Sequence, residues 1–215
     1  MDKPRYSLEG RIALVTGASS GLGAHLARLY AAAGAAVVLG ARRVDRTQAL
    51  ADDIKKAGGR ALSVAMDVTD EGSIVAAFDA AEAAFGAPDV VLANAGLAEA
   101  GRAVDLELDR VNRVIETNFT GVYLTAREGA RRMIAAGSKQ SERGRIILTG
   151  SITADMTGQG DSAYAATKAA VAHLGRQLAR EWARLGINVN VIQPGYIRTE
   201  IDGDWFDSEG GKAQI

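Results

Sequence analysis

The sequence predicts an α/β fold in which a doubly wound parallel sheet lies between two layers of helices. Short apolar runs alternate along the chain with longer segments whose apolar residues recur with the period of a helix. Several of the short runs are almost continuous in Val, Ile, Leu and Ala, as is typical of strands covered on both faces. Because a helix separates one strand from the next, we expect the strands to be parallel and joined by right-handed crossovers.

The predicted strands are short apolar segments spread over the whole chain. They lie at Ile12–Val15, Ala36–Leu39, Ala61–Ala65, Val90–Ala93, Ile146–Thr149 and Ile187–Ile192. The last of them alternates Ile and Val with Asn. This last segment therefore fits a strand buried on both faces less well than the others do.

The predicted helices occupy the longer segments between these strands, at about 21–33, 45–57, 70–85, 106–136 and 162–185. Glycines follow the first three of them, at Gly34, Gly58–Gly59 and Gly86, as left-handed C-terminal caps would. Either Thr69 or Asp70 can cap the N-terminus of the third helix.

The segment 106–136 can hold one bent helix or two helices, and Gly121 inside it does not decide between them. Gly137–Gly144 is expected to be a polar, flexible loop. No repeat, linker or low-complexity block divides the chain. We therefore expect residues 1–215 to form a single domain.

The composition excludes several classes of protein. The 215 residues are 47% hydrophobic and 24% charged with a formal net charge of -1, so nothing points to nucleic acid or to an acidic membrane surface. With no cysteine and only two histidines, disulfides and a metal site are not expected. Residues 1–11 lack the apolar core of a signal peptide, and no run approaches the ~20 apolar residues of a membrane span. The expectation is a soluble, cytoplasmic protein.

A glycine-rich segment, TGASSGLG at residues 16–23, lies between the first strand and the first helix. In such a unit one glycine permits the tight turn, one lets the backbone approach a pyrophosphate, and one lets the helix pack closely on the strand. The helix N-terminus then offers amide hydrogens and partial positive charge to the phosphates. A plain glycine-bearing turn is the alternative, but this context favours a dinucleotide-binding turn. Its residues are Gly17, Ser19, Ser20, Gly21, Leu22 and Gly23.

Tyr164 and Lys168 are four residues apart on a predicted helix and therefore project from the same face. An ammonium near a phenol favours the phenolate and lowers the pKa of the tyrosine, which lets it exchange protons with an alcohol near neutral pH. Such a pair alone is common and is usually unremarkable. Ser151, however, lies thirteen residues upstream at the end of an apolar strand, where doubly wound sheets bind ligands. Its hydroxyl can donate to the carbonyl oxygen of a ketone.

The spacing TGxxxGxG resembles that of the classical short-chain dehydrogenase/reductase family, and further motifs of that family follow in order along nearly the whole chain. The resemblance implies a Rossmann-like three-layer αβα sandwich. It implies that Ser151, Tyr164 and Lys168 form an active site that transfers a hydride between a nicotinamide cofactor and a ketone or secondary alcohol. It also implies that Asn118, in a segment similar to the family's Asn-x-x-Gly, helps to hold a water that links the lysine to solvent.

Further cofactor contacts are implied by the same resemblance. Tyr164 and Lys168 are implied to contact the cofactor as well as to act in catalysis, with Lys168 holding the nicotinamide ribose. The other contacts follow the third, fourth and sixth predicted strands: Asp67, Val68, Asn94, Ala95, Gly96, Pro194, Gly195, Ile197 and Thr199. The chain departs from the family pattern at Ala93, which stands where the family has a first Asn. The Asn-Ala-Gly part that remains suffices for a backbone that passes close to the cofactor.

The end of the second strand bears on which nicotinamide cofactor is used. An acidic side chain there accepts hydrogen bonds from a ribose 2′-hydroxyl, whereas an arginine pairs with a 2′-phosphate. Ala41 stands where members of the family that use NAD carry Asp, and Arg42 follows it directly. The pattern resembles that of members that use NADP and rely on the arginine at this position, here Arg42, with help from Arg43. Solvated arginines are the alternative, but the pattern favours NADP(H) over NAD(H).

Residues 200–215 resemble the start of the family's substrate lid, in which Trp205 and Phe206 could contact the substrate or a neighbouring subunit. Members of the family usually continue with another helix and a seventh strand beside the sixth. We therefore expect this C-terminal strand to be missing from the chain and Ile187–Ile192 to be an edge strand.

The expected partner is a small-molecule carbonyl or alcohol substrate, which the sequence does not identify further. The resemblance also implies a homotetramer or homodimer formed through the helices at 106–136 and 162–185. A non-catalytic NADP-binding sensor or scaffold is the alternative function, against which the intact Ser151–Tyr164–Lys168 set argues. An epimerase or dehydratase is disfavoured by the glycine spacing.

Overall fold

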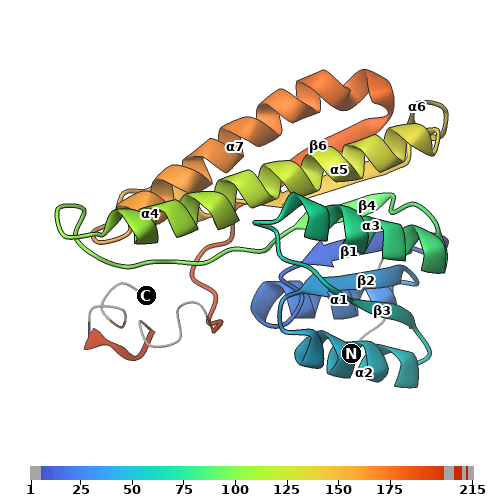
Figure 1. Ribbon diagram of the computed structural model, residues 1–215, viewed down its shortest axis with the longest axis horizontal. Coiled ribbons are helices and arrows are strands. Elements are labelled where there is room, and N and C mark those ends of the chain that lie inside the picture. Colours follow the sequence, from blue (N-terminus) through green and yellow to red (C-terminus); the bar gives the residue numbers. More distant parts are fainter. Residues whose placement is uncertain (1–5, 201–205, 210–211, 213–215) are drawn as a thin grey trace.

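A computed structural model describes residues 6–200, 206–209 and 212 of the chain. Its centre is a six-stranded, fully parallel sheet with the strand order β3-β2-β1-β4-β5-β6. This order, which reverses direction between β1 and β4, confirms the predicted doubly wound α/β fold (Figure 1). The strands are β1 (Ile12–Thr16), β2 (Ala36–Ala41), β3 (Arg60–Ala65), β4 (Val90–Ala93), β5 (Gly144–Thr149) and β6 (Ile187–Ile192).

Helices cover both faces of the sheet. They are α1 (Gly21–Ala32), α2 (Val44–Lys56), α3 (Glu71–Phe85), α4 (Leu108–Ile115), α5 (Gly121–Ala135), the short α6 (Ser138–Ser141) and α7 (Ser162–Trp182). On one face α3, α5 and α7 bury Phe78, Ala126 and Val171 against the strands. On the other face α1 and α2 bury Ala27 and Leu50, so the sheet is the middle of three layers (Figure 1).

The long predicted helical segment consists of two α-helices joined by a π-helical turn. Glu116–Thr120 forms this turn between α4 and α5, and the backbone continues through it in helical conformation. Gly121 begins α5 directly after the turn. A Cβ atom at Gly121 would lie 2.9 Å from the carbonyl oxygen of Val68, so this glycine lets α5 lie close to the chain that leaves β3.

The predicted ends of the first three helices agree with the structure. Gly34, Gly58 and Gly86 have positive φ angles of 102°, 85° and 101°, a conformation that favours glycine. Asp70, rather than Thr69, caps α3, because its carboxylate accepts a hydrogen bond of 2.8 Å from the amide of Gly72.

The prediction that Gly137–Gly144 is only a polar loop is wrong. Ser138–Ser141 forms the short helix α6. Ser138 is buried, and its hydroxyl donates a 2.6 Å hydrogen bond to the carbonyl of Leu185. This contact with a distant part of the chain anchors a segment whose composition alone favours a loop.

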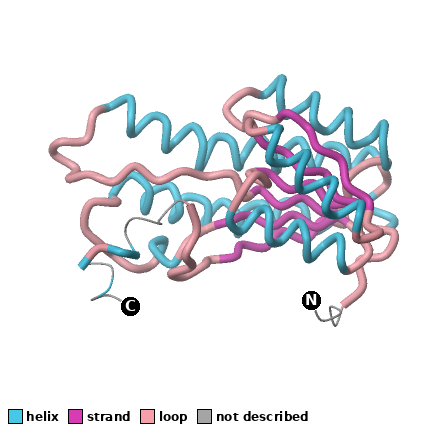
Figure 2. Tube along the Cα trace, turned by 90° about the horizontal axis from the view of Figure 1, so that it is seen from below, coloured by secondary structure: helices cyan, strands magenta, loops and turns pink. Residues whose placement is uncertain are grey.

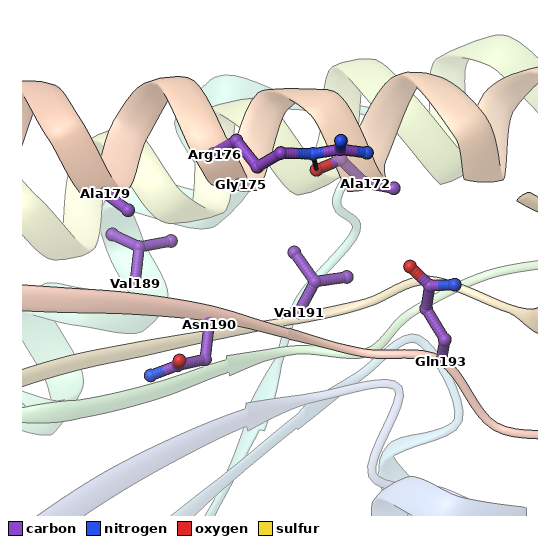
Figure 3. A pocket seen from close by; sticks show the side chains of 8 residues that line it. All are labelled: Ala172, Gly175, Arg176, Ala179, Val189, Asn190, Val191 and Gln193. Carbon is purple, nitrogen blue, oxygen red and sulfur yellow. Dashed lines mark hydrogen bonds between the residues drawn. The ribbon is translucent and has the colours of Figure 1, made fainter.

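Among the described residues, β6 is at one edge of the sheet, with α7 packed along it. Asn188 and Asn190 are exposed while Ile187 and Val189 are buried, which explains the alternating sequence of this strand. Polar side chains on an exposed edge strand disfavour pairing with other chains. A groove of about 400 Å³ lies between α7 and β6 (Figure 3). It is lined by Ala172, Gly175, Arg176, Ala179, Val189, Asn190, Val191 and Gln193.

The long loops gather at one end of the sheet, on the left in Figure 2, and the N-terminus lies at the opposite end. In a parallel sheet all carboxyl ends of strands meet on one side, and ligands of doubly wound folds bind there. No helix in the described parts of the chain is long and apolar enough to cross a membrane.

Candidate active site

The glycine-rich turn after β1 is tied to the chain that follows β4. The Thr16 hydroxyl oxygen accepts hydrogen bonds from the amides of Asn94 and Ala95, at 2.9 and 3.0 Å. The Asn94 side chain donates in return to the Thr16 carbonyl at 3.1 Å. Thr16 is thus a positioning residue for two of the predicted cofactor segments. Sequence reasoning placed it in the motif without giving it this role.

Each glycine of the turn has a steric or conformational reason to be glycine. A Cβ at Gly17 would lie 2.9 Å from the Cα of Ala95, and one at Gly23 would overlap the Gly17 carbonyl and lie 2.7 Å from the Asn94 Nδ2. Gly21 has a φ of +53°, and Thr199 lies against it, 3.4 Å from where its Cβ would be. These close approaches match the roles expected of a dinucleotide-binding turn, with Leu22 half-buried at the start of α1.

The arginine that reaches the glycine-rich turn is Arg43. Its Nε and Nη2 donate to the Ser19 hydroxyl at 3.1 and 2.9 Å, and Nη2 donates to the Ser20 hydroxyl at 2.8 Å. Arg42 is also exposed, while Ala41 before it is buried. The sequence pattern favours Arg42 as the leading residue, whereas the geometry brings Arg43 onto the predicted phosphate-binding residues.

The chain after β3 carries the predicted pair Asp67 and Val68. Burial acts to raise the pKa of Asp67, but hydrogen bonds from the Thr69 amide and hydroxyl outweigh it, and the nearby charge of Arg42 adds to them. The pKa is therefore below its ordinary value. Val68 is buried against Gly121 and fixes the backbone at this point. The carboxylate of Asp67 and the charge of Arg42 lie close together at the edge of the sheet.

Asn118 lies in the π-helical turn, fully buried, and holds the backbone of the loop after β4. Its Oδ1 accepts from the Leu97 amide at 2.9 Å and its Nδ2 donates to the Leu97 carbonyl at 2.8 Å. A Cβ at Gly96 would lie 3.3 Å from the Asn118 Oδ1 and 3.7 Å from the Lys168 Nζ. Two residues 50 positions apart in the sequence are thus brought to the same glycine.

Lys168 is the most deeply buried charged group of the site. Its side chain points from α7 to the end of β5, where Nζ donates to the Thr149 carbonyl at 2.9 Å. The residue is 3% exposed, and burial lowers the pKa of its ammonium group to about 8. Nζ lies 5.4 Å from the centre of the half-buried Tyr164 ring. The predicted pairing of these two side chains on one helix face is therefore present in the structure.

Ser151 lies one residue after Gly150, which directly follows β5, and it is 8% exposed. Its Oγ accepts hydrogen bonds from the Thr153 amide at 3.2 Å and from the Thr153 hydroxyl at 3.0 Å. Because a hydroxyl oxygen has two acceptor positions, these bonds leave the Ser151 hydrogen as the group that can donate outward. Thr153 was not found by sequence reasoning, although a hydroxyl residue two positions after the serine is a visible signal.

The 3₁₀ turn Ile152–Ala154 packs against α7, which places the end of β5 beside the helix that carries Tyr164. The chain after β6 then crosses this region. Its Pro194 carbonyl accepts from the Ile152 amide at 3.0 Å, and five residues later Thr199 reaches Gly21. Gly195 and Ile197 between them are exposed.

Beyond this crossing only part of the predicted lid is described. Phe206 is buried, and the Arg198 guanidinium lies 5.2 Å from the centre of its ring. Arg198 also pairs with Asp207 at 3.1 Å. Trp205 lies outside the described residues. In the described parts of the chain, no group of three or more His, Cys, Asp or Glu side chains could hold a metal ion.

Comparison with known proteins agrees with this geometry. A family model described as short chain dehydrogenase matches residues 11–210. The chain is 44% identical over 192 residues to the cis-4-hydroxycyclohexanecarboxylate dehydrogenase of Sinomonas cyclohexanicum, covering 89% of this chain and 75% of the relative. It is 36% identical over 195 residues to the 3-oxoacyl-acyl-carrier-protein reductase FabG of Escherichia coli, covering 91% of this chain and 77% of the relative.

The chain is also similar in fold and in sequence to solved structures. A gluconate 5-dehydrogenase of Burkholderia cenocepacia, solved in complex with NADP and tartrate, matches with a TM-score of 0.91 and 35% identity. That match covers 98% of this chain and 80% of the neighbour. A short-chain type dehydrogenase/reductase of Mycobacterium marinum matches with a TM-score of 0.89 and 39% identity, over 94% of this chain and 78% of the neighbour.

Proposed function

The chain belongs to the short-chain dehydrogenase family of oxidoreductases, and on this basis we propose that it transfers a hydride between NADP(H) and a ketone or secondary alcohol. The observation that carries the proposal is the placement of Lys168. A buried ammonium held by the Thr149 carbonyl, beside the Tyr164 ring and next to Asn118, has a clear use in proton transfer.

The residues at the carboxyl ends of the strands fit a dinucleotide. The turn at residues 17–23 would hold the pyrophosphate at the start of α1, Asp67 the adenosine side, and Asn94–Gly96 and Pro194–Thr199 the nicotinamide side. When bound, NADP(H) supplies or accepts the hydride. The chain itself must bind the substrate oxygen and move the accompanying proton.

Ser151 and Tyr164 act on that oxygen. The Ser151 hydroxyl, oriented by Thr153, donates a hydrogen bond to the substrate carbonyl. Tyr164 gives its phenolic proton to the same oxygen during reduction and takes it back during oxidation. The positive charge of Lys168 stabilises the phenolate that this leaves. Tyr164 then regains its proton from Lys168. Asn118, which holds the neighbouring backbone at Leu97, supports a water through which Lys168 in turn regains a proton from solvent.

Assays of NADPH oxidation with ketones of graded size test the proposal directly. We expect turnover with at least one class of ketone and the reverse reaction with the matching alcohol. Binding of NADPH without turnover on any carbonyl or alcohol would instead favour a non-catalytic sensor or scaffold. The relatives include a hydroxycyclohexanecarboxylate dehydrogenase, a 3-oxoacyl reductase and a gluconate 5-dehydrogenase, so cyclic ketones, 3-oxoacyl thioesters and keto sugar acids form the first panel.

The preference for NADP(H) over NAD(H) is supported by the positive charge at the end of β2 and by the NADP named in the Burkholderia cenocepacia structure. We expect Arg42→Asp to shift the ratio of kcat/KM for NADPH to that for NADH toward NADH by roughly ten- to hundredfold. The reason is that a carboxylate repels a 2′-phosphate and accepts from a 2′-hydroxyl. Steady-state kinetics with both cofactors measure the ratio.

Arg184→Asp is the matched control, because Arg184 is an exposed arginine in the 3₁₀ turn Ala183–Leu185, at the other end of the sheet. It should leave the ratio unchanged. A wild-type enzyme that prefers NADH would contradict the cofactor assignment. An Arg42→Asp enzyme whose cofactor ratio stays at the wild-type value would contradict the role of Arg42 and leave Arg43 as the arginine of the 2′-phosphate subsite.

The expected assembly through the long helices also stays a proposal. Exposed apolar side chains along α4 and α5 support it, since Leu108 and Ile115 on α4 and Tyr123 and Ile134 on α5 all face solvent in the single chain. Sedimentation of the purified protein distinguishes a monomer from a dimer or tetramer.

A further inference from the structure

Glu200 joins the chain after β6 to the arginines of the β2–α2 connection. Its Oε2 accepts from the Arg43 Nη1 at 2.9 Å, and its Oε1 accepts from the Arg46 Nη1 at 2.7 Å. One carboxylate thus bridges two guanidinium groups, both of which hold the pKa of Glu200 below its ordinary value. Sequence reasoning named neither Glu200 nor Arg46 as a site residue.

The same Arg43 is already engaged with the glycine-rich turn. A guanidinium has five N–H donors. In Arg43 three hydrogen bonds go to Ser19 and Ser20, and one goes to Glu200. Four of the five donors are thus engaged, so a phosphate monoester that bound this arginine through more than one hydrogen bond would have to replace a partner that is present in the structure. Glu200 is the partner most readily replaced, because it carries the same charge as the incoming group and is itself exposed.

The position of Glu200 in the chain adds a second consequence. It directly follows Thr199, which lies against Gly21 of the glycine-rich turn. When Glu200 pairs with Arg43 and Arg46, these ion pairs hold the chain after β6 against the start of α1. When the arginines bind another anion, this fastening is lost.

We propose, building on the assignment of NADP(H), that Glu200 is an internal counter-ion of the 2′-phosphate subsite. The 2′-phosphate of NADP(H) displaces its carboxylate from Arg43 and Arg46, whereas NAD(H), which has a hydroxyl there, leaves the ion pairs intact. Glu200 thereby reduces the selectivity for NADP(H), since it lowers the affinity for the phosphorylated cofactor alone. It also couples phosphate binding to release of the chain beside Gly21.

The expected effect is moderate because these ion pairs are exposed. The side chains of Arg43, Arg46 and Glu200 are 44%, 45% and 54% exposed, and pairs in such surroundings are weak and screened by salt. We expect Glu200→Gln to lower the dissociation constant of NADPH by about three- to tenfold at low ionic strength, with less effect at high salt. The dissociation constant of NADH should not change.

Calorimetric titration of the full chain measures these constants without any substrate. Adenosine 2′,5′-bisphosphate and adenosine 5′-phosphate complete the set of probes, because they differ only in the 2′-phosphate. Glu200→Gln should tighten binding of the bisphosphate and leave that of the monophosphate unchanged. Asp207→Asn is the matched control, since it removes a carboxylate from a nearby ion pair with Arg198 that does not involve Arg43 or Arg46.

Two outcomes overturn the inference. Weaker binding of the bisphosphate by Glu200→Gln would mean that Glu200 supports the subsite. Equal changes for bisphosphate and monophosphate, including no change for either, would mean that Glu200 does not act on the 2′-phosphate. Both are read from the adenosine pair, whichever nicotinamide cofactor the enzyme prefers. A wild-type preference for NADH over NADPH would contradict the proposed cofactor instead, so the two failures are distinguishable.

Discussion

Replacing Tyr164 with Phe is expected to lower the turnover number by about 10²–10⁴-fold, the range for removal of a general acid–base group. The substitution keeps the ring that lies 5.4 Å from the Lys168 Nζ and removes only the phenolic hydroxyl. Packing at the start of α7 is therefore retained, and NADPH should bind with its wild-type dissociation constant. Single-turnover kinetics with NADPH and a ketone substrate, combined with a cofactor titration, separate the two quantities.

Tyr123→Phe provides the matched control for this substitution. Tyr123 is an exposed tyrosine on α5, and removal of its hydroxyl should leave turnover unchanged. If Tyr164→Phe retained wild-type turnover, another group would have to supply the proton. If it lost cofactor binding together with turnover, the hydroxyl would serve binding and not proton transfer.

Replacing Lys168 with Met is expected to reduce turnover at neutral pH by about 10²-fold or more, because the phenolate of Tyr164 loses its stabilising charge. Burial lowers the pKa of Lys168 to about 8, so the ammonium is charged below that pH and neutral above it. The wild-type rate of the step that needs this charge should therefore decline above pH 8. The variant should lack that decline, and pH–rate profiles of both proteins show it.

The same group makes a separate prediction for stability. The pKa of Lys168 is about 8 in the folded chain and has its ordinary value of 10.5 in the unfolded chain. The cost of burying the charge is complete below pH 8 and is relieved as the pH rises from 8 to 10.5. The free energy of unfolding of the wild type, relative to Lys168→Met, should therefore increase over this interval.

Urea denaturation of both proteins at several pH values measures the difference. Lys139→Met changes an exposed lysine of α6. Its free energy of unfolding, plotted against pH, should run parallel to that of the wild type. If the curves of Lys168→Met and the wild type also ran parallel, the pKa of Lys168 would not be lowered in the folded state.

The strands, the glycine-rich turn and the Tyr164–Lys168 pair could be predicted because their signals are local. A strand of Val, Ile and Leu, or two side chains four apart on a helix, is set by residues that are neighbours in the sequence. Chain topology then brings these local features together, since parallel strands end on the same side of a sheet. The positions of Asn94, Ser151 and Pro194 along that edge follow from this rule.

What the sequence could not predict depends on contacts between distant residues. The π-helical turn places Asn118 so that it hydrogen-bonds with the backbone of Leu97, which is 21 positions away. No local sequence pattern specifies this turn. Glu200 meets Arg43 across 157 positions, through two exposed side chains that an isolated sequence presents as ordinary surface charges. The sequence could not predict which of Arg42 and Arg43 contacts the glycine-rich turn either. Adjacent residues differ in the direction of their side chains, and this direction is known only from the structure.

The π-helical turn at Glu116–Thr120 also affects the outer surface of the molecule. A wider turn acts as a one-residue insertion in a helix, and each residue of an α-helix turns the chain by about 100°. The outward faces of α4 and α5 are therefore out of phase with each other, although the two helices form one rod. A partner that packed along both helices would contact two separate surfaces, one on α4 and one on α5, and not a single continuous surface. Deleting one residue in the turn would align the two surfaces, at the expense of withdrawing Asn118 from the loop that it holds.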